Sequence, residues 1–449
     1  MEGSIPLIDR RRFLTHSARL MGGGWSAFAA LQALACERRE FRVPALGYGP
    51  LEDAGPELAL PAGFQYRVIG VQGSPMSDGR PTPPLHDGMA AFALPNGKVR
   101  LIRNHEVGSA AAAGATLGDP ARAYDLLTGG GTTSLEIDPA TRELTRDFVS
   151  LSGTLRNCAG GPTPWQSWIT CEESFADQRQ GYQRRHGYVF DVPVSAERDV
   201  PAEPLPALGR FVHEAVAVDP VTGIVYETED QRQAGFYRFV PDGTYQPGQR
   251  PNLSRGRLQM LAVRDRPRYD TGSGQVAGAA LPVTWVDIPD SDPAGTSVEV
   301  DAVFRQGWDQ GAARFARIEG CWHERGAIYF SCTSGGDAEL GQIWRHRPGL
   351  DGGGLTLVFE SPHRDILKNP DNICSTPKGA IVLCEDASGS CLIRGLTPEG
   401  EIFDFARNIA NGSEFAGATF SPDGQTLFVN IQATGQTVAI WGPWDRGPF

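Results

Sequence analysis

Short strand-like runs, each bounded by tight-turn residues, recur along most of this chain. Apolar and polar residues alternate within the runs with the period of two that is typical of β-strands. Asp-Pro-x-Thr and Pro-Asp-Gly sequences stand between several runs, and such sequences favour hairpin turns. The pattern therefore predicts a long series of antiparallel hairpins. The clearest runs are SLEIDPATREL (134–144), GYVFDVPVS (187–195), AVAVDPVTGIVYET (215–228), FYRFVPDG (236–243), AIYFSCTSGG (327–336), QIWRHRPG (342–349), AIVLCEDA (380–387), LIRGLTPEGEIFDFA (392–406) and ATFSPDGQTLFVNI (418–431).

The composition agrees with many tight turns between short elements. The chain holds 55 glycines and 34 prolines in 449 residues, whereas average usage near 7% and 5% would give about 54 of the two together. Long helices are scarce. Repeated antiparallel hairpins favour a closed radial array, because that architecture leaves few long strand edges exposed.

We therefore predict an all-β fold, a β-propeller with six blades. A single large sandwich would need longer strands, and two separate sandwiches would need a linker that the sequence does not show. Residues 242–300 are predicted to be a long loop inserted over one face of the propeller.

The first residues resemble an export signal. The sequence DRRRFL (9–14) places a twin arginine before a mildly apolar, glycine-broken segment that ends at Ala35. This order is typical of a Tat signal. Ala33-Leu34-Ala35 supplies small residues for cleavage, and Cys36 directly after it is a candidate for lipidation. Cleavage to a soluble form and a lipid anchor at Cys36 both remain open.

These features predict three segments: a signal peptide at 1–35, a linker at 36–54 and a single propeller domain at 55–449. No later run is long and apolar enough to span a bilayer, so we expect no membrane span after processing. Tat carries folded proteins, which suits a metalloenzyme loaded before export. The expected location is the periplasm or the medium.

The charge and the cysteines limit the classes of partner. A formal net charge of −12 argues against nucleic acid and is compatible with many cation-binding carboxylates. Eight cysteines are too few for a disulfide scaffold in a chain of this size. Cys321 with Cys332, or Cys384 with Cys391, are possible pairs that spacing alone cannot decide.

One segment combines a thiol with carboxylates. TPWQSWITCEES (163–174) ends a β-prone run with Cys171, Glu172 and Glu173. Sulfur favours zinc, copper or iron, while carboxylates also hold calcium, magnesium and ferric ions. The alternative is a buried structural cysteine beside solvated glutamates.

Similar acidic motifs follow other strand-like runs, at positions where a propeller gathers loops around its axis. Each motif alone is compatible with surface charge, but together they favour a cation site, because strand ends flanked by Gly, Cys and aromatic residues rarely carry uncompensated charge. The motifs are Asn104-His105-Glu106, Cys171-Glu172-Glu173, His213-Glu214, Glu227-Thr228-Glu229-Asp230, Arg317-Ile318-Glu319-Gly320, Asp371-Asn372 and Cys384-Glu385-Asp386.

Several other chemistries are excluded by missing motifs. His105, His213 and His323 each lack a histidine four places later, so there is no zincin helix. The sequence contains neither a G-x-S-x-G elbow nor a P-loop. Oxygen donors dominate, which favours calcium together with a hard ion that one cysteine could also bind.

Over residues 55–435 the sequence resembles the PhoX-type alkaline phosphatases. NCAGGPTPWQSWITCEE is the most specific part of this resemblance. It implies a six-bladed propeller, exported by Tat, that hydrolyses phosphate esters with ferric and calcium ions and without a covalent phosphoenzyme. The matching motifs are LPAGFQYRVI (60–69), HDGMAAF (86–92), NHE (104–106), NCAGGPTPWQSWITCEE (157–173), HEAVAVDP (213–220), ARIEG (316–320), PDN (370–372) and LCEDA (383–387).

The resemblance also implies roles for individual residues. Cys171 would bind iron, and Arg317 would hold the phosphate. Strand alternation makes Glu173, on the face of Cys171, a rival to Glu172. The acidic residues implied as ligands of iron or calcium are Glu214, Glu229 and Glu319, with Asp371, Asn372, Glu385, Glu106 and Glu172 completing the calcium shell.

Elementary chemistry supports these roles. Phosphoryl transfer depends on positioning and on neutralising charge over three equatorial oxygens. A metal ion lowers the pKa of its water, so that a metal-bound oxide or hydroxide can attack without a serine nucleophile. An arginine adds planar, bidentate donors for phosphate, although Arg317 could instead form a salt bridge with Glu319.

Two other functions are compatible with the same fold. A lactonase-like hydrolase would hold a calcium ion on the propeller axis but would need neither a thiolate nor a phosphate-facing arginine. A non-catalytic binding propeller predicts dispersed carboxylates and an apolar rim. We expect small phosphate esters and the Tat machinery as partners, and a monomer.

Overall fold

The computed structural model describes residues 46–295, 297–387 and 389–449. The twin-arginine motif, the predicted cleavage site and Cys36 lie outside these residues. Within the described part of the chain, no helix combines the length and the apolar character that crossing a membrane requires.

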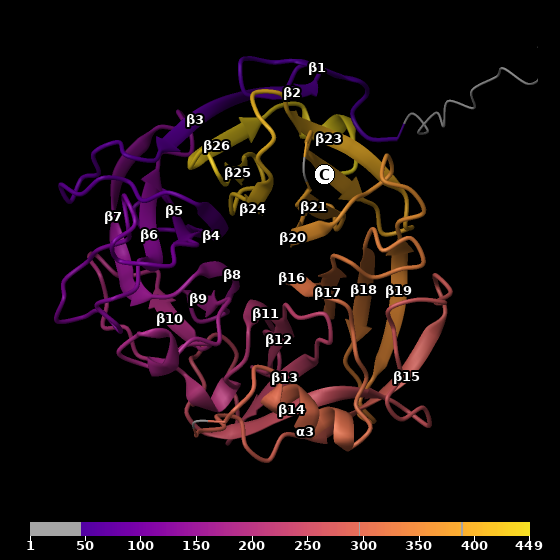
Figure 1. Ribbon diagram of the computed structural model, residues 1–449. Coiled ribbons are helices and arrows are strands. Elements are labelled where there is room, and N and C mark those ends of the chain that lie inside the picture. The colour runs from indigo at the N-terminus through magenta and orange to yellow at the C-terminus, as the bar shows by residue number, and fades with distance from the viewer. Residues whose placement is uncertain (1–45, 296, 388) are drawn as a thin grey trace, which may run out of the picture. The chain divides into compact units, whose positions relative to one another are not determined.

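The described strands form blades that radiate from a central axis (Figure 1). In each blade the first main strand of the antiparallel sheet lies innermost and the following strands lie progressively further out. The six innermost strands are β4, β8, β11, β16, β20 and β24, and each packs beside the next around a closed ring. This arrangement confirms the predicted β-propeller.

The strands take up most of the predicted runs. By blade they are β4 (His86–Ala93), β5 (Val99–His105), β6 (Gly130–Ile137) and β7 (Leu144–Thr154); β8 (Asn157–Pro162), β9 (Ser167–Glu172) and β10 (Val189–Pro193); β11 (His213–Val218), β12 (Val225–Glu229), β13 (Phe236–Pro241), β14 (Gly256–Val263) and β15 (Ala280–Asp287); β16 (Ile318–Glu324), β17 (Ala327–Cys332), β18 (Gln342–Arg347) and β19 (Gly354–Glu360); β20 (Pro370–Ser375), β21 (Ile381–Glu385), β22 (Leu392–Leu396), β23 (Ile402–Asn408), β2 (Leu58–Pro61) and β1 (Leu51–Asp53); β24 (Phe415–Phe420), β25 (Leu427–Ile431), β26 (Gln436–Trp441) and β3 (Gln65–Val71).

By hydrogen bonding, these strands make five sheets rather than six, because two blades are joined. β15 pairs with β14 through residues 283–287 and with β19 through residues 280–282. The blades that begin at β11 and β16 therefore share one nine-stranded sheet. The ring still has six inner strands, one for each predicted blade.

Residues 242–300 are not simply a loop inserted over one face. They contain β14 and β15, which extend the blade of β11 outward. The short helix α3 (Ala302–Asp309) follows and packs Val303 and Phe304 against Met260 of β14. The turn-rich composition of this segment concealed two strands.

The two ends of the described chain meet in one blade. β3, near its start, pairs with β26, near its end, from Gln65↔Trp441 to Val71↔Gln436. This pairing closes the ring by joining strands from both ends of the described chain. β1 pairs with β2 on the outside of another blade, so the sheets take in Leu51–Asp53 from the segment expected to be a linker.

The core lies between neighbouring blades rather than at the axis. In one interface Phe236 stacks on Phe330 of the next blade at a centroid distance of 4.3 Å. In another, Phe64, Phe405 and Trp444 pack at 4.8–5.4 Å. Each large buried side chain contributes about 1.5–3 kcal/mol, so these contacts hold the blades in place and leave the axis for polar residues.

Candidate metal centre

All six inner strands carry a β-bulge near their first residue. Two residues of each inner strand are skipped in its pairing with the second strand of the blade. A bulge re-aims side chains and often occurs beside a functional site. The first skipped residues are Asp87, Cys158, Glu214, Glu319, Asp371 and Gly417. Five of the six bulges therefore present a carboxylate or a thiol at the same level of the ring.

Small residues allow the bulged strands to approach one another. A Cβ added to Gly320 would lie 2.6 Å from the carbonyl oxygen of Asp371, and one added to Gly88 would lie 2.6 Å from the Cα of Ala159. All six inner strands line a hollow of only about 20 Å³ below the bulges, little more than the ~10–15 Å³ that one water needs. The acidic centre is therefore nearly closed on one side.

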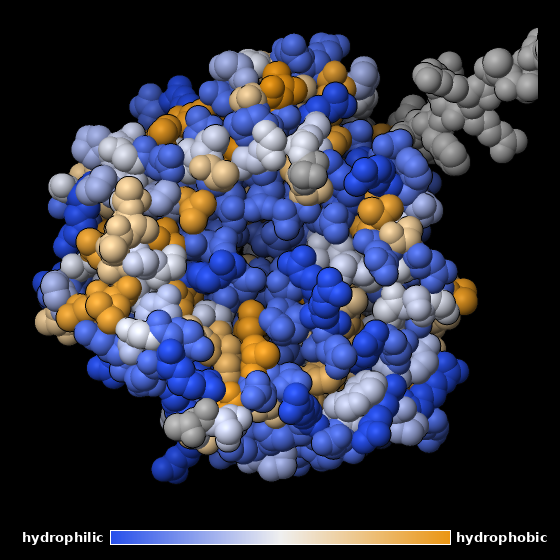
Figure 2. Space-filling view, in the orientation of Figure 1, coloured by the Kyte–Doolittle hydropathy of each residue, from blue (hydrophilic) through white to orange (hydrophobic). Residues whose placement is uncertain are grey.

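A second set of acidic residues follows the second strand of four blades. Glu106 comes directly after β5, Glu173 after β9, Asp230 after β12 and Asp386 after β21. The second strands run antiparallel to the inner strands, so they end at the level where the inner strands begin. Figure 2 shows that hydrophilic residues surround the central hollow on this face.

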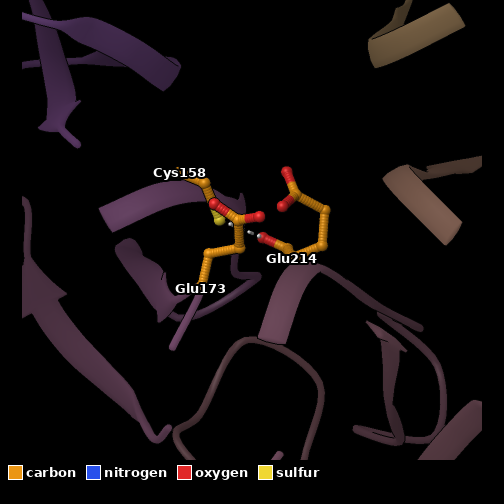
Figure 3. A group of neighbouring side chains, drawn as sticks. All are labelled: Cys158, Glu173 and Glu214. Atoms are coloured by element: carbon orange, nitrogen blue, oxygen red, sulfur yellow. Dashed lines mark hydrogen bonds between the residues drawn. The ribbon is translucent and has the colours of Figure 1, made fainter. Parts of the chain in front are cut away.

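Two groups of potential metal ligands form where these sets meet. The ligand atoms of Cys158, Glu173 and Glu214 lie within 4.8 Å of one another, and so do those of Glu214, Glu319 and Asp371. Figure 3 shows the thiol of Cys158 and the carboxylates of Glu173 and Glu214 turned toward a common point. Glu214 belongs to both groups, so the two candidate positions are adjacent.

The electrostatics of these groups call for a cation. Burial raises the pKa of Glu214 well above its ordinary value, and Asp371 and Glu173 raise it further. Burial and Glu106 raise the pKa of Glu173 to about 8. Burial likewise raises the pKa of Cys158, with Glu214 adding to the effect. Buried like charges are unfavourable unless a cation compensates them, and multivalent ions reverse such shifts. The ligand atoms of the two groups, carboxylate oxygens and one sulfur, are suitable ligands for such multivalent ions.

Two arginines stand at the rim of the acidic centre. Arg317 donates from Nε and Nη2 to the carboxylate of Asp230, at 2.8 and 2.9 Å, and from Nη2 to Glu319 at 2.7 Å. Arg156 pairs through Nη2 with Glu106 and Glu173. Both side chains are partly exposed, at 37% and 46%. The salt bridge with Glu319 considered for Arg317 is therefore present, and the guanidinium lies beside a candidate ligand.

Three of the glutamates predicted as ligands lie elsewhere. Glu172 accepts hydrogen bonds from His186 and from the backbone of Gly187 and Tyr188. The corresponding contacts of Glu229 are with the Gly235 amide and the Tyr237 hydroxyl, and those of Glu385 are with Leu392 and Arg394. Each is the last residue of the second strand of its blade and is hydrogen-bonded to residues at the start of the third strand. The residue after each one reaches the centre, because adjacent residues of a strand face opposite ways.

Cys171 is also away from both ligand groups. It is fully buried in an apolar cluster with Ile169, Val189 and Val216. Cys158, in the same sequence motif, takes the expected place of the thiol because it lies in a bulge on an inner strand. The motif NCAGG placed a cysteine directly before small residues, and this was the signal that could have identified it.

Most of the remaining predicted residues face the acidic centre, and one of them joins the inner strands around it. Glu106, Glu214, Glu319 and Asp371 face the acidic centre, as does Arg317 at its rim. Asn372 accepts a hydrogen bond from the Gly417 amide at 2.6 Å and donates to Asp371, so it joins two inner strands. The ligands implied by the resemblance did not include Asp87, Cys158, Asp230, Asp386 or Glu414, although Asp230 and Asp386 belong to the acidic motifs found in the sequence.

The pKa values of Glu414 and Asp87 are raised by carboxylates of the same acidic centre. Burial and Asp386 raise the pKa of Glu414 to about 11. Burial also raises the pKa of Asp87, with Glu106 and Asp371 adding to it. A further cation position beside the two groups would relieve these carboxylates as well. Only the HDG motif (86–88), already part of the family resemblance, pointed to Asp87.

All seven cysteines within the described residues are free and buried. The pairs considered from the sequence, Cys321 with Cys332 and Cys384 with Cys391, are not bonded. Cys391 instead contacts the carbonyl oxygen of Ala387 at 2.9 Å.

A separate hollow of about 680 Å³ lies at the opposite ends of the blades. It is lined by the turn after β4, by Trp165 and Gln166 between β8 and β9, and by residues after β10. The inner strands begin at the acidic centre and end here, so this hollow is remote from the carboxylates.

Together these features define a β-propeller with a candidate metal centre, acidic and thiol-containing, on its axis. Residues 46–435 match the family described as "Alkaline phosphatase PhoX", and the chain therefore belongs to the PhoX family, whose members are metal-dependent phosphatases. The match confirms the resemblance found in the sequence motifs. No curated protein matches this sequence.

A solved structure shows the same fold. Pseudomonas fluorescens PhoX in complex with vanadate, a transition state analogue, is 18% identical, with a TM-score of 0.69 over 90% of this chain and 98% of the other. A gluconolactonase from Xanthomonas campestris is 13% identical, with a TM-score of 0.41 over 87% of this chain and 99% of the other.

Proposed function

We propose that this chain hydrolyses phosphate monoesters at the acidic centre of its propeller. One observation carries the proposal: two groups of ligand atoms share Glu214, and the arginine at the rim beside them, Arg317, contacts Glu319 of the second group. Adjacent cations and a guanidinium are what a dianionic phosphate needs, because its hydrolysis depends on positioning and on charge neutralisation.

The ligand groups suggest which ions they hold. Cys158 with Glu173 and Glu214 combines sulfur and oxygen, which suits Fe³⁺ among the ions that the family resemblance implies. Glu214 with Glu319 and Asp371 offers oxygen alone, which suits a further Fe³⁺ or a Ca²⁺ ion. Glu106, Asp87, Asp386 and Glu414 supply additional oxygens for Ca²⁺.

When bound, such ions lower the pKa of water and neutralise phosphate charge. The residues of the chain supply the rest. Glu214 fixes the spacing of the two groups, and Arg317 holds phosphate oxygens by charge-assisted hydrogen bonds. Asp230 orients Arg317 through two parallel hydrogen bonds. The nearly closed side of the centre restricts access to the opposite face.

We further propose hydrolysis without a covalent phosphoenzyme, as the resemblance implies. Export by Tat, followed by cleavage after Ala35 or lipidation of Cys36, would place the enzyme in the periplasm or outside the cell. The mass of the mature N-terminus distinguishes the two forms, since an acylated Cys36 adds the mass of its lipid.

The test is metal analysis of the exported protein together with an assay on a generic phosphomonoester. We expect bound iron and calcium, activity that chelation removes, and activity that returns with those ions. A lactone serves as the control substrate. Lactone turnover without phosphatase activity, or full phosphatase activity after complete metal removal, would contradict the proposal.

A further inference from the structure

Arg156 occupies the same position in the blade of β8 that Arg317 occupies in the blade of β16. Each directly precedes an inner strand and lies two residues before a candidate ligand, Cys158 or Glu319. Each adopts a positive φ, 51° and 49°. That conformation costs a non-glycine residue about 1–3 kcal/mol and is concentrated at functional sites.

The backbone contacts of the two arginines are also equivalent. The Arg156 amide donates to Val107, just after Glu106, and the Arg317 amide donates to Gln231, just after Asp230. The backbone carbonyl oxygen of each arginine accepts a hydrogen bond from the backbone amide of the first residue after the second strand of its own blade. The fold therefore presents two guanidiniums at the same level, with the blade of β11 and its Glu214 between them.

Each arginine contacts one of the two ligand groups. Arg156 pairs with Glu173 of the group that contains Cys158, whereas Arg317 pairs with Glu319 of the other. The two ion pairs of Arg156 run through Nη2. Its Nε also donates to the carbonyl oxygen of Glu173, at 3.3 Å. A guanidinium carries five N–H donors, so Arg156 keeps the two donors of Nη1 for a phosphate oxygen. Its side chain is 46% exposed, which leaves it accessible to substrate.

We propose that Arg156 is a second phosphate-binding arginine that favours dianionic monoesters over monoanionic diesters. This inference rests on the proposed function and deepens it. A phosphate held beside Glu214 meets a guanidinium from either side, and the second one adds most to binding when the phosphate carries a second negative charge.

The alternative is a purely structural role. Arg156 lies between Glu106 and Glu173 and offsets the repulsion between them. A counter-ion of this kind would matter for metal content and stability but not for the choice between monoester and diester. The two roles therefore give different results in the same variants.

The experiment compares metal-loaded wild type, Arg156→Ala, Arg156→Lys and Arg317→Ala. Arg325→Ala is the matched control, because Arg325 also has a positive φ of 46° and pairs with Glu324 in the turn between β16 and β17. The measurements are metal content, kcat and KM for a simple phosphomonoester and a phosphodiester, and the inhibition constant of inorganic phosphate.

We expect Arg156→Ala to raise the monoester KM and the phosphate inhibition constant roughly 10- to 100-fold, the range for a charge-assisted hydrogen bond. The diester should change less, and Arg156→Lys should recover part of the loss because it keeps the charge without the planar donors. Metal content and the Arg325→Ala variant should match wild type.

Unchanged phosphate inhibition in Arg156→Ala would overturn the inference, and so would equal losses on monoester and diester. If Arg156→Ala loses metal, Arg156→Lys decides: a raised monoester KM with full metal content supports substrate contact, and an unchanged KM overturns it. A wild-type protein without phosphatase activity would instead contradict the proposed function, so the two failures are distinguishable.

Discussion

Glu214 is the residue on which both ligand groups depend. It is 2% exposed, and burial and neighbouring carboxylates raise its pKa. One carboxylate shared between two positions fixes their separation through the geometry of a single side chain. In the proposed centre Cys158 would have a different task, because a thiolate would select the ion that one of those positions accepts.

We predict that Cys158→Ser removes the thiolate-bound ion and lowers phosphatase activity by about 100-fold or more, since even residues that only support metal ligands account for 10- to 100-fold. Cys171→Ser is the matched control. It places a hydroxyl in an apolar cluster and should cost about 1–3 kcal/mol of stability while retaining metal. Metal analysis, visible absorption and activity check both. Metal loss from Cys171→Ser alone would reverse the assignment.

At the scale of the strand, the candidate ligands are the residues at which the pairing between the first and second strands of a blade is interrupted. The sequence predicts the hairpins well, because alternation and turn residues are local features. It does not reveal the bulges in β8, β11 or β16, since a bulge depends on how the inner strands crowd the axis. Carboxylates one position apart, such as Glu172 and Glu173, then face opposite ways. Motif position alone therefore identified the strand ends, but at three of them the side chain that it named, Glu172, Glu229 or Glu385, contacts residues at the start of the third strand of its blade instead of the acidic centre.

We predict that Gly320→Ala disturbs the centre from the backbone. Its Cβ would lie 2.6 Å from the Asp371 carbonyl and the Ile373 amide, neither of which can move freely. Forced overpacking costs about 1–3 kcal/mol, and here it would separate Glu319 from Asp371. Gly354→Ala in β19 is the control, because its Cβ meets only one atom, at 4.0 Å. Urea unfolding and metal content measure the difference. Equal stability and metal content in the two variants would contradict the prediction.

At the scale of the whole molecule, the propeller brings together residues that are remote in sequence. Asp87 on β4 and Gln432 after β25 are hydrogen-bonded at 2.9 Å, although 345 positions separate them. The resemblance to a family gave the fold and the enzyme class, and four of the acidic residues that it named, Glu106, Glu214, Glu319 and Asp371, lie at the acidic centre. The joining of two blades through β15 and the pairing of β3 with β26 depend on contacts between distant segments, which local patterns do not contain.

The last prediction concerns the dependence of stability on metal and pH. Without cations, the raised pKa values of Glu214, Glu319 and Asp371 mean that the folded protein binds protons more tightly than the unfolded chain. Stability is then fully present below the ordinary pKa near 4 and is lost as pH rises through the folded values, which for Glu173 is about 8. The chelated protein should therefore lose melting temperature steadily between about pH 5 and pH 9.

Bound cations reverse this dependence, because they bind the ionised carboxylates and compete with protons. The metal-loaded protein should keep its melting temperature up to alkaline pH, so the gap between the two forms should widen as pH rises. Thermal unfolding of both forms across the pH range measures it. Parallel melting curves would show that the carboxylates gathered on the axis do not hold the ions that stabilise this propeller.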